Sequence, residues 1–67
     1  MFIEITTMKR EERVSINLMH VVLLSSYRNG TYILLQDGEE YHAKETYSEL
    51  VRLINSKKTK NKENGEK

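Results

Sequence analysis

The side chains that could perform chemistry in this 67-residue chain are few and far apart in the sequence. The chain has no cysteine, and its three glycines are isolated, so it offers neither a thiol nucleophile nor a glycine-rich phosphate loop. No serine lies near both a histidine and an orienting carboxylate in the sequence. The carboxylate pairs at 11–12 and 39–40 fall in charged or turn-forming segments, where acidic side chains are normally solvated. We therefore expect no catalytic residues.

The sequence also lacks the residues needed for a disulfide or a closed metal site. His20 and His42 are the only histidines, and two separate histidines do not make a closed zinc site. A domain of this size buries only ~60% of its unfolded surface. Such domains usually gain stability from disulfides, a metal or oligomerisation. The chain has no cysteine for a disulfide, and we expect no metal and no cofactor. Self-association is therefore the expected source of extra stability.

The remaining chemistry is that of binding. Tyr27 and Tyr32 flank the Asn29-Gly30 dipeptide with Arg28 beside them, an arrangement that could stack single-stranded nucleic acid bases. Tyrosine is equally typical of strand packing and of protein interfaces. The sequence thus indicates a binding protein, and its partner could be either a protein or a nucleic acid.

Charge divides the chain into two parts. Residues 1–56 hold six Lys or Arg and eight Asp or Glu, whereas residues 57–67 hold five Lys and two Glu. Duplex-binding domains normally carry excess positive charge in their folded part, which disfavours that function here. Residues 57–67 contain no apolar residue, so we expect a disordered basic tail that either solubilises the chain or contacts acidic partners.

The elements that position these side chains are mostly strands. Short β-branched and apolar runs predict strands at 2–7, 13–18, 21–27, 32–36 and 40–44. The turn signals Asn29-Gly30 and Asp37-Gly38 predict an antiparallel meander of the last three. A helical stripe follows at 46–56, made of Tyr47, Leu50, Val51 and Ile54, with Thr46 and Glu49 spaced as a capping box. The expected fold is α+β and mainly β: one domain, residues 1–56, with a small antiparallel sheet of four to five strands and one C-terminal helix.

Membrane insertion is not expected. The longest apolar run is Val21–Leu24, far from the ~20 residues that span a bilayer. The first residues have neither a basic lead nor a long apolar stretch, so they do not resemble a signal peptide. We expect a cytoplasmic protein.

The predicted hairpin at 21–36 is apolar on both sides. A two-residue turn at Asn29-Gly30 would pair Tyr27 with Tyr32 and Leu24 with Leu35. One face would then carry Val22, Leu24, Ile33 and Leu35, and the other Val21, Leu23, Tyr27, Tyr32 and Leu34. The Asp37-Gly38 turn has two possible forms. A two-residue turn places Tyr41 with Tyr32 and Leu34, and a three-residue turn with a bulge at Gly38 places it with Ile33 and Leu35.

Several segments together resemble the FlbD/SwrD family of small flagellum-associated proteins. They are Ile3–Thr6, Ile16-Asn17, Tyr32–Tyr41 and Lys44–Thr46, followed by the short amphipathic helix. The resemblance covers about residues 2–54 and implies a non-catalytic role in motility through protein contacts. It also implies a core containing Ile33 and Leu35, and hence the three-residue turn.

Residues 14–54 also look like the first half of a LytTR DNA-binding domain, through the apolar strand, Asn29, Tyr32, Asp37–Glu39 and the following helix. The second half of such a domain is missing, and residues 1–56 are acidic. The small, Lys- and Asn-rich composition would equally suit an accessory protein of a mobile element. A small nucleic-acid-binding accessory or regulatory protein is therefore the alternative function.

One helix can cover only one face of the sheet, and large exposed apolar patches are rare on soluble monomers. We therefore expect a protein partner, most simply in a homodimer. The expected contact residues are Leu23, Tyr32 and Leu34, with Tyr27 at the rim. The other possibility is that the first or second strand closes the second face.

Overall fold

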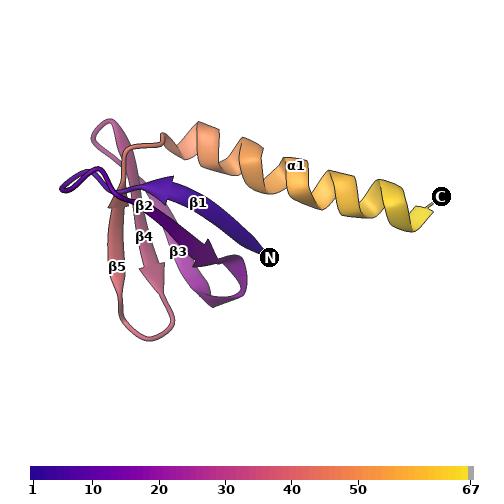
Figure 1. Ribbon diagram of the computed structural model, residues 1–67, viewed down its shortest axis with the longest axis horizontal. Coiled ribbons are helices and arrows are strands. Elements are labelled where there is room, and N and C mark those ends of the chain that lie inside the picture. Colours follow the sequence, from indigo (N-terminus) through magenta and orange to yellow (C-terminus); the bar gives the residue numbers. More distant parts are fainter. Residues whose placement is uncertain (67) are drawn as a thin grey trace.

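The computed structural model describes the backbone of residues 1–66 and the side chains of residues 1–57. Along residues 1–66, five strands, a single 3-10 turn and one helix follow each other (Figure 1). They are β1 (Phe2–Thr6), β2 (Arg13–Asn17), η1 (Leu18–His20), β3 (Val21–Tyr27), β4 (Gly30–Leu35), β5 (Glu40–Ala43) and α1 (Tyr47–Glu66). The predicted α+β, mainly β fold with four to five antiparallel strands and one C-terminal helix is confirmed, with five strands in the described residues. Among the described residues, no helix is both long and apolar enough to cross a bilayer.

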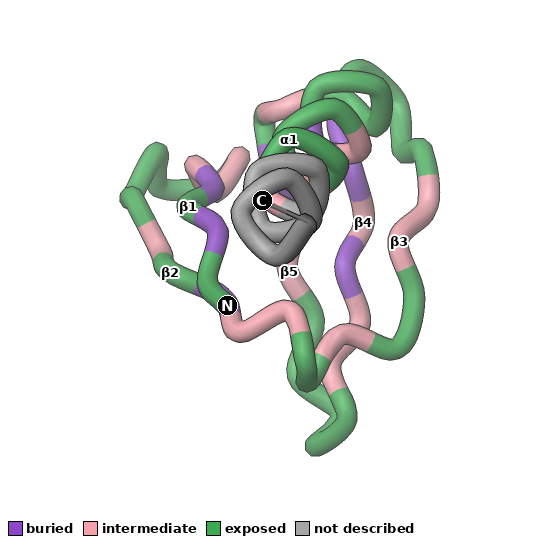
Figure 2. Tube along the Cα trace, turned by 90° about the vertical axis from the view of Figure 1, so that its right-hand side faces the viewer, coloured by how far each residue is buried: buried purple, intermediate pink, exposed green. Residues whose placement is uncertain are grey.

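The strands form two small antiparallel sheets, β1-β2 and β3-β4-β5, where one continuous sheet had been expected. Backbone hydrogen bonds join the two sheets at one corner. Met8 donates its backbone N–H to the His42 carbonyl at 2.8 Å, and Lys44 donates to the Thr6 carbonyl at 2.7 Å. Past this corner the β1-β2 hairpin bends away and folds back over one face of the β3–β5 sheet (Figure 2).

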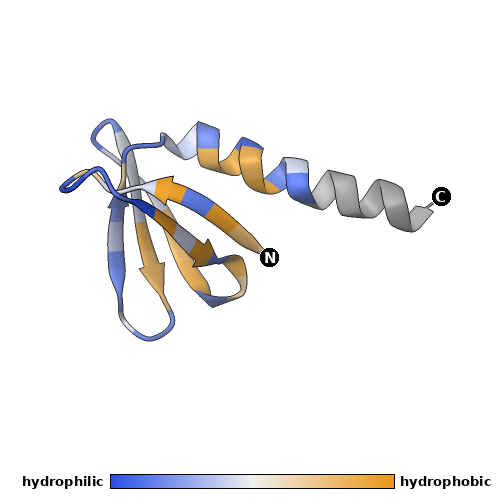
Figure 3. Ribbon diagram, viewed as in Figure 1, coloured by the Kyte–Doolittle hydropathy of each residue, from blue (hydrophilic) through white to orange (hydrophobic). Residues whose placement is uncertain are grey.

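The core lies between the two sheets and under the helix. Its buried apolar side chains come from all three layers: Ile3, Ile5, Ile16, Ile33, Ala43 and Leu50. Strand alternation explains the set, because Ile3 pairs with Ile16 and Ile33 pairs with Tyr41 on the inward side of their hairpins. The apolar side of α1 faces the strands (Figure 3). We call the side of the β3–β5 sheet that faces α1 and the β1-β2 hairpin the inner face.

Helix α1 begins with the predicted capping box. Thr46 accepts from the Glu49 N–H at 3.1 Å, and the Glu49 carboxylate accepts from the Thr46 N–H at 2.9 Å. Leu50 is buried, Val51 and Ile54 are half-buried, and Tyr47 is 43% exposed, so Tyr47 does not belong to the packed stripe.

The helix continues to Glu66, ten residues beyond the expected end near 56. The segment contains no proline, and its lysines and glutamates are compatible with a helical backbone. The prediction of a disordered tail at 57–67 falls on residues whose side chains, except that of Lys57, lie outside the described part, and it stays a prediction.

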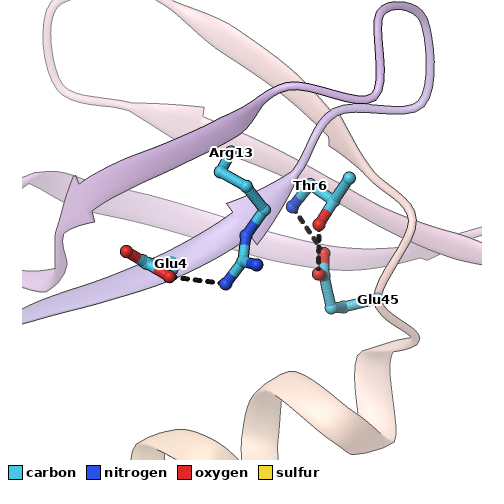
Figure 4. A network of polar contacts seen from close by, with 4 residues as sticks. All are labelled: Glu4, Thr6, Arg13 and Glu45. Atoms are coloured by element: carbon cyan, nitrogen blue, oxygen red, sulfur yellow. Dashed lines mark hydrogen bonds and ion pairs between the residues drawn. The ribbon is translucent and has the colours of Figure 1, made fainter.

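A carboxylate locks the β5–α1 connection to β1. Glu45 accepts from the backbone N–H and the hydroxyl of Thr6, both at 2.9 Å, while Arg13 pairs with Glu4 on the neighbouring strand (Figure 4). The hydroxyl of the fully buried Thr31 donates to the Glu45 carbonyl at 2.8 Å. Burial alone would raise the pKa of Glu45, but the bonds from Thr6, its own backbone N–H and the charge of Arg13 together lower it.

The β3–β4 turn differs from its prediction. Tyr27 pairs with Gly30 and Leu24 with Ile33, so the two turn residues are Arg28 and Asn29, and Arg28 takes a positive φ of 53°. Gly30 is the first residue of β4, and its backbone lies against β5. A Cβ there would collide with the Ala43 carbonyl oxygen and the end of Met8. Close approach of two strands, and not the turn, is therefore what requires this glycine.

A bulge at Val22 exchanges the first two residues of β3. Val21 pairs with Leu35 and Leu23 with Leu34, so Val22 has no partner. Val21 consequently joins the inner face and Val22 turns outward, the reverse of the predicted faces. The Asp37-Gly38 turn has the three-residue form: Leu35 donates to the Glu39 carbonyl, Ile33 pairs with Tyr41, and Gly38 has a φ of 93°.

Candidate interaction surface

The side of the β3–β5 sheet that points away from the core carries all four predicted contact residues. We call it the outer face; its larger side chains are Val22, Leu23, Tyr27, Tyr32, Leu34, His42 and the charged Glu40, which lies beside Leu34. Pairing places Leu23 beside Leu34 and Ser25 beside Tyr32, and Tyr32 beside His42 of the next strand. Strand register thus gathers residues from three strands into one surface.

No described element covers the outer face. The β1-β2 hairpin and the described part of α1 contribute to the inner core instead, so neither of the first two strands closes the second face. Val22 is 60% exposed, Leu23 45% and Tyr27 37%, while Tyr32 and Leu34 are half-buried by their neighbours. The sheet therefore presents an apolar surface to solvent at the end formed by Val22, Leu23 and Leu34.

The other end of the outer face holds a row of aromatic rings. The Tyr27 and His42 rings stack at 4.5 Å between centroids with 29° between planes, and Tyr32 lies tilted at 5.5 Å from His42. The Arg28 guanidinium carbon lies 5.4 Å from the centre of the Tyr27 ring. The sequence prediction did not include His42. The signal for it was its position opposite Tyr32, which depends on the three-residue form of the Gly38 turn.

Two tyrosine hydroxyls are tied to carboxylates. Tyr32 donates to Glu40 at 2.9 Å, and this hydrogen bond, with desolvation and the Glu40 charge, raises the pKa of Tyr32. Desolvation and the Glu39 charge, with a 3.2 Å bond to Glu39, raise the pKa of Tyr41. Both phenols therefore stay protonated at neutral pH and act as hydrogen-bond donors.

An open hollow of about 560 Å³ lies beyond the aromatic row, between the β1–β2 loop and the β3–β4 turn. Its floor and walls include Tyr27, His42 and three cationic side chains, Lys9, Arg10 and Arg28. Glu12 and Glu40 also line it. In the described part of the chain, no three His, Asp or Glu side chains are grouped so that they could hold a metal ion.

Comparison with known proteins gives no relative: no family model, no curated protein and no solved structure matches the chain.

Proposed function

We propose that the protein is a small, non-catalytic interaction module that self-associates through the outer face of its β3–β5 sheet. The observation that carries the proposal is the uncovered apolar end of that face, where Leu23 and Leu34 lie side by side. A two-fold arrangement would bring this patch against its own copy, as in most homodimers. The aromatic end would then lie at the rim of the interface, because the polar groups of tyrosine and histidine can still form hydrogen bonds with water there.

The energetics support a modest affinity. Covering about 400 Å² of apolar surface, summed over the two subunits, contributes ~10 kcal/mol at ~25 cal/mol per Å². Association costs from ~4 to above 15 kcal/mol in lost freedom and desolvation. A dimer in the micromolar range fits that balance.

The cellular setting of the proposal rests on the resemblance to the FlbD/SwrD family. We propose an accessory factor of flagellar motility that works in the cytoplasm through protein contacts. A self-associating module without chemistry of its own suits a role in organising other proteins.

Sedimentation of the full chain over a range of concentrations tests self-association. Leu34→Glu places a charge at the centre of the apolar patch and should give a folded monomer. Leu53→Glu is the matched control, because it makes the same change at an exposed position of α1, away from the outer face. The control should associate as the unmutated chain does. A monomeric unmutated chain at millimolar concentration would refute the proposal.

A further inference from the structure

The hollow beside the aromatic row brings together three segments that are distant in the sequence. The β1–β2 loop supplies Lys9 and Arg10, the β3–β4 turn supplies Arg28, and β5 supplies His42. The corner hydrogen bond from Met8 to the His42 carbonyl anchors the loop beside β5. The cations are therefore held around the aromatic row by the fold.

Within the described part of the chain, none of the three cations of the hollow forms an ion pair, although Arg28 lies against the Tyr27 ring. The ion pairs between described side chains are Arg13–Glu4 and Lys44–Glu11, and neither involves Lys9, Arg10 or Arg28. Glu12 and Glu40 offset two of the three positive charges. A ligand of this hollow therefore gains little from charge alone and must also gain from the aromatic row.

The backbone on both sides of the hollow supports a binding role. Arg28 at the β3–β4 turn has a φ of 53°, and Glu11 in the β1–β2 loop has a φ of 56°. Residues other than Gly, Asn and Asp rarely adopt this left-handed backbone conformation. Glycine would satisfy the turn at position 28 with less strain, whereas arginine at this position places a guanidinium beside the Tyr27 ring.

We propose that the hollow binds a short segment of single-stranded nucleic acid. One base stacks at the Tyr27–His42 pair, in the place where the Arg28 guanidinium now lies or at the open end of the row, and Arg28, Lys9 and Arg10 contact the flanking phosphates. Aromatic stacking is the sequence-tolerant source of affinity in such sites. A duplex, whose bases are already stacked, gains nothing from the row, and an acidic peptide would meet Glu12 and Glu40 without needing flat rings.

Fluorescence anisotropy with labelled single-stranded oligoribonucleotides and oligodeoxyribonucleotides at low ionic strength tests this site. The full chain should bind single strands more tightly than the matching duplexes. Arg28→Gly and Tyr27→Leu should each weaken binding about tenfold. Arg28→Gly relieves the strained turn, so loss of binding by this variant cannot come from unfolding. Arg52→Ala removes the same charge from an exposed position of α1 and should bind like the unmutated chain.

Other results would overturn the site. They are absence of binding, equal affinity for duplex and single strand, unchanged affinity of Arg28→Gly, or competition by polyglutamate as effective as by unlabelled single strands. All variants retain residues 57–67, so binding through the basic tail would appear as unchanged affinity in Arg28→Gly. Leu34→Glu separates this site from the self-association proposal, because a monomeric variant should keep its affinity for single strands.

Discussion

The inner and outer faces of the β3–β5 sheet are built from the same residue types but have different surroundings. Ile33, on the inner face, is fully buried beneath the helix and against the β1-β2 hairpin, whereas Leu23 on the outer face is 45% exposed. Hydrophobicity of the strands alone does not distinguish them. What separates a core from an interaction surface here is the rest of the chain, which folds back over one side only.

The two faces also differ in their use of polar groups. On the inner side, the buried Thr31 hydroxyl donates to the Glu45 carbonyl, and among the described residues no buried side-chain nitrogen or oxygen is left without a hydrogen bond. On the outer side, the Tyr32 hydroxyl bonds to the exposed Glu40, and the Tyr27 and His42 rings stack in contact with solvent. The inner face is thus complete within one chain, and the outer face can accept further contacts.

The largest expected effect comes from emptying the inner face. Leu50→Ala removes a fully buried side chain and should destabilise the fold by ~2–5 kcal/mol. The unfolding free energy of a domain of this size is ~5 kcal/mol in total, so much of the population should be unfolded. Thermal unfolding followed by circular dichroism measures this, with Leu53→Ala as the exposed control on the same helix. A stable Leu50→Ala protein would mean that α1 is peripheral to the core.

A smaller but still clear effect is expected at Gly30, where the backbones of the neighbouring strands β4 and β5 approach each other closely. Gly30→Ala would push its methyl group into the Ala43 carbonyl oxygen, which is fixed in a strand. Overpacking of this kind costs ~1–3 kcal/mol. Gly38→Asn is the matched control, because Gly38 has open space around it and asparagine tolerates its positive φ. Chemical denaturation should rank Gly30→Ala below Gly38→Asn; the reverse order would show that space at Gly30 is not limiting.

Local patterns in the sequence predicted the elements and most of the outer face. Alternation located the strands, the Thr46–Glu49 spacing located the helix start, and the odd-numbered residues Leu23 and Tyr27 fell on the outer side as expected. Dipeptide signals were less informative about the β3–β4 turn. Asn29-Gly30 reads as a turn in isolation, but contact of Gly30 with Ala43 and Met8 from distant segments decides its role.

Features created by long-range contacts were not predictable from local patterns. The bulge at Val22 exchanged Val21 and Val22 between the faces, and no turn residue marks it. The split into two sheets depends on the corner formed by Thr6–Met8 and His42–Lys44, which are more than thirty residues apart. His42 joined the outer face only because the Gly38 turn fixed the register of β5.

Acid should weaken the hydrogen bonds by which Glu45, in the β5–α1 connection, holds Thr6 of β1. The pKa of Glu45 in the fold lies below its ordinary value of 4.5, so its contribution to stability is present above that pH and is lost as the pH falls through the lowered value. Glu45→Gln lacks this contribution, so its stability deficit should be largest at neutral pH and should shrink below 4.5. Denaturant midpoints measured across this range for both proteins test the effect. Thr6→Val, which removes one donor to Glu45, should show a smaller deficit with the same pH dependence, and a deficit independent of pH would contradict the role of the charge.

The smallest expected effect on the isolated fold is on the outer face. Leu23→Thr places a β-branched strand former at an exposed position, so at low protein concentration its unfolding free energy should change by less than ~0.5 kcal/mol. At high concentration the two proteins should separate, because association of folded chains raises the melting temperature of the unmutated protein by mass action. The variant should show little or no such rise. Calorimetry over a wide range of concentrations measures this, and Phe2→Thr is the control, since Phe2 is exposed on β1 outside the outer face. Equal concentration dependence in Leu23→Thr and the unmutated chain would mean that the outer face, although open, is not where the molecules meet.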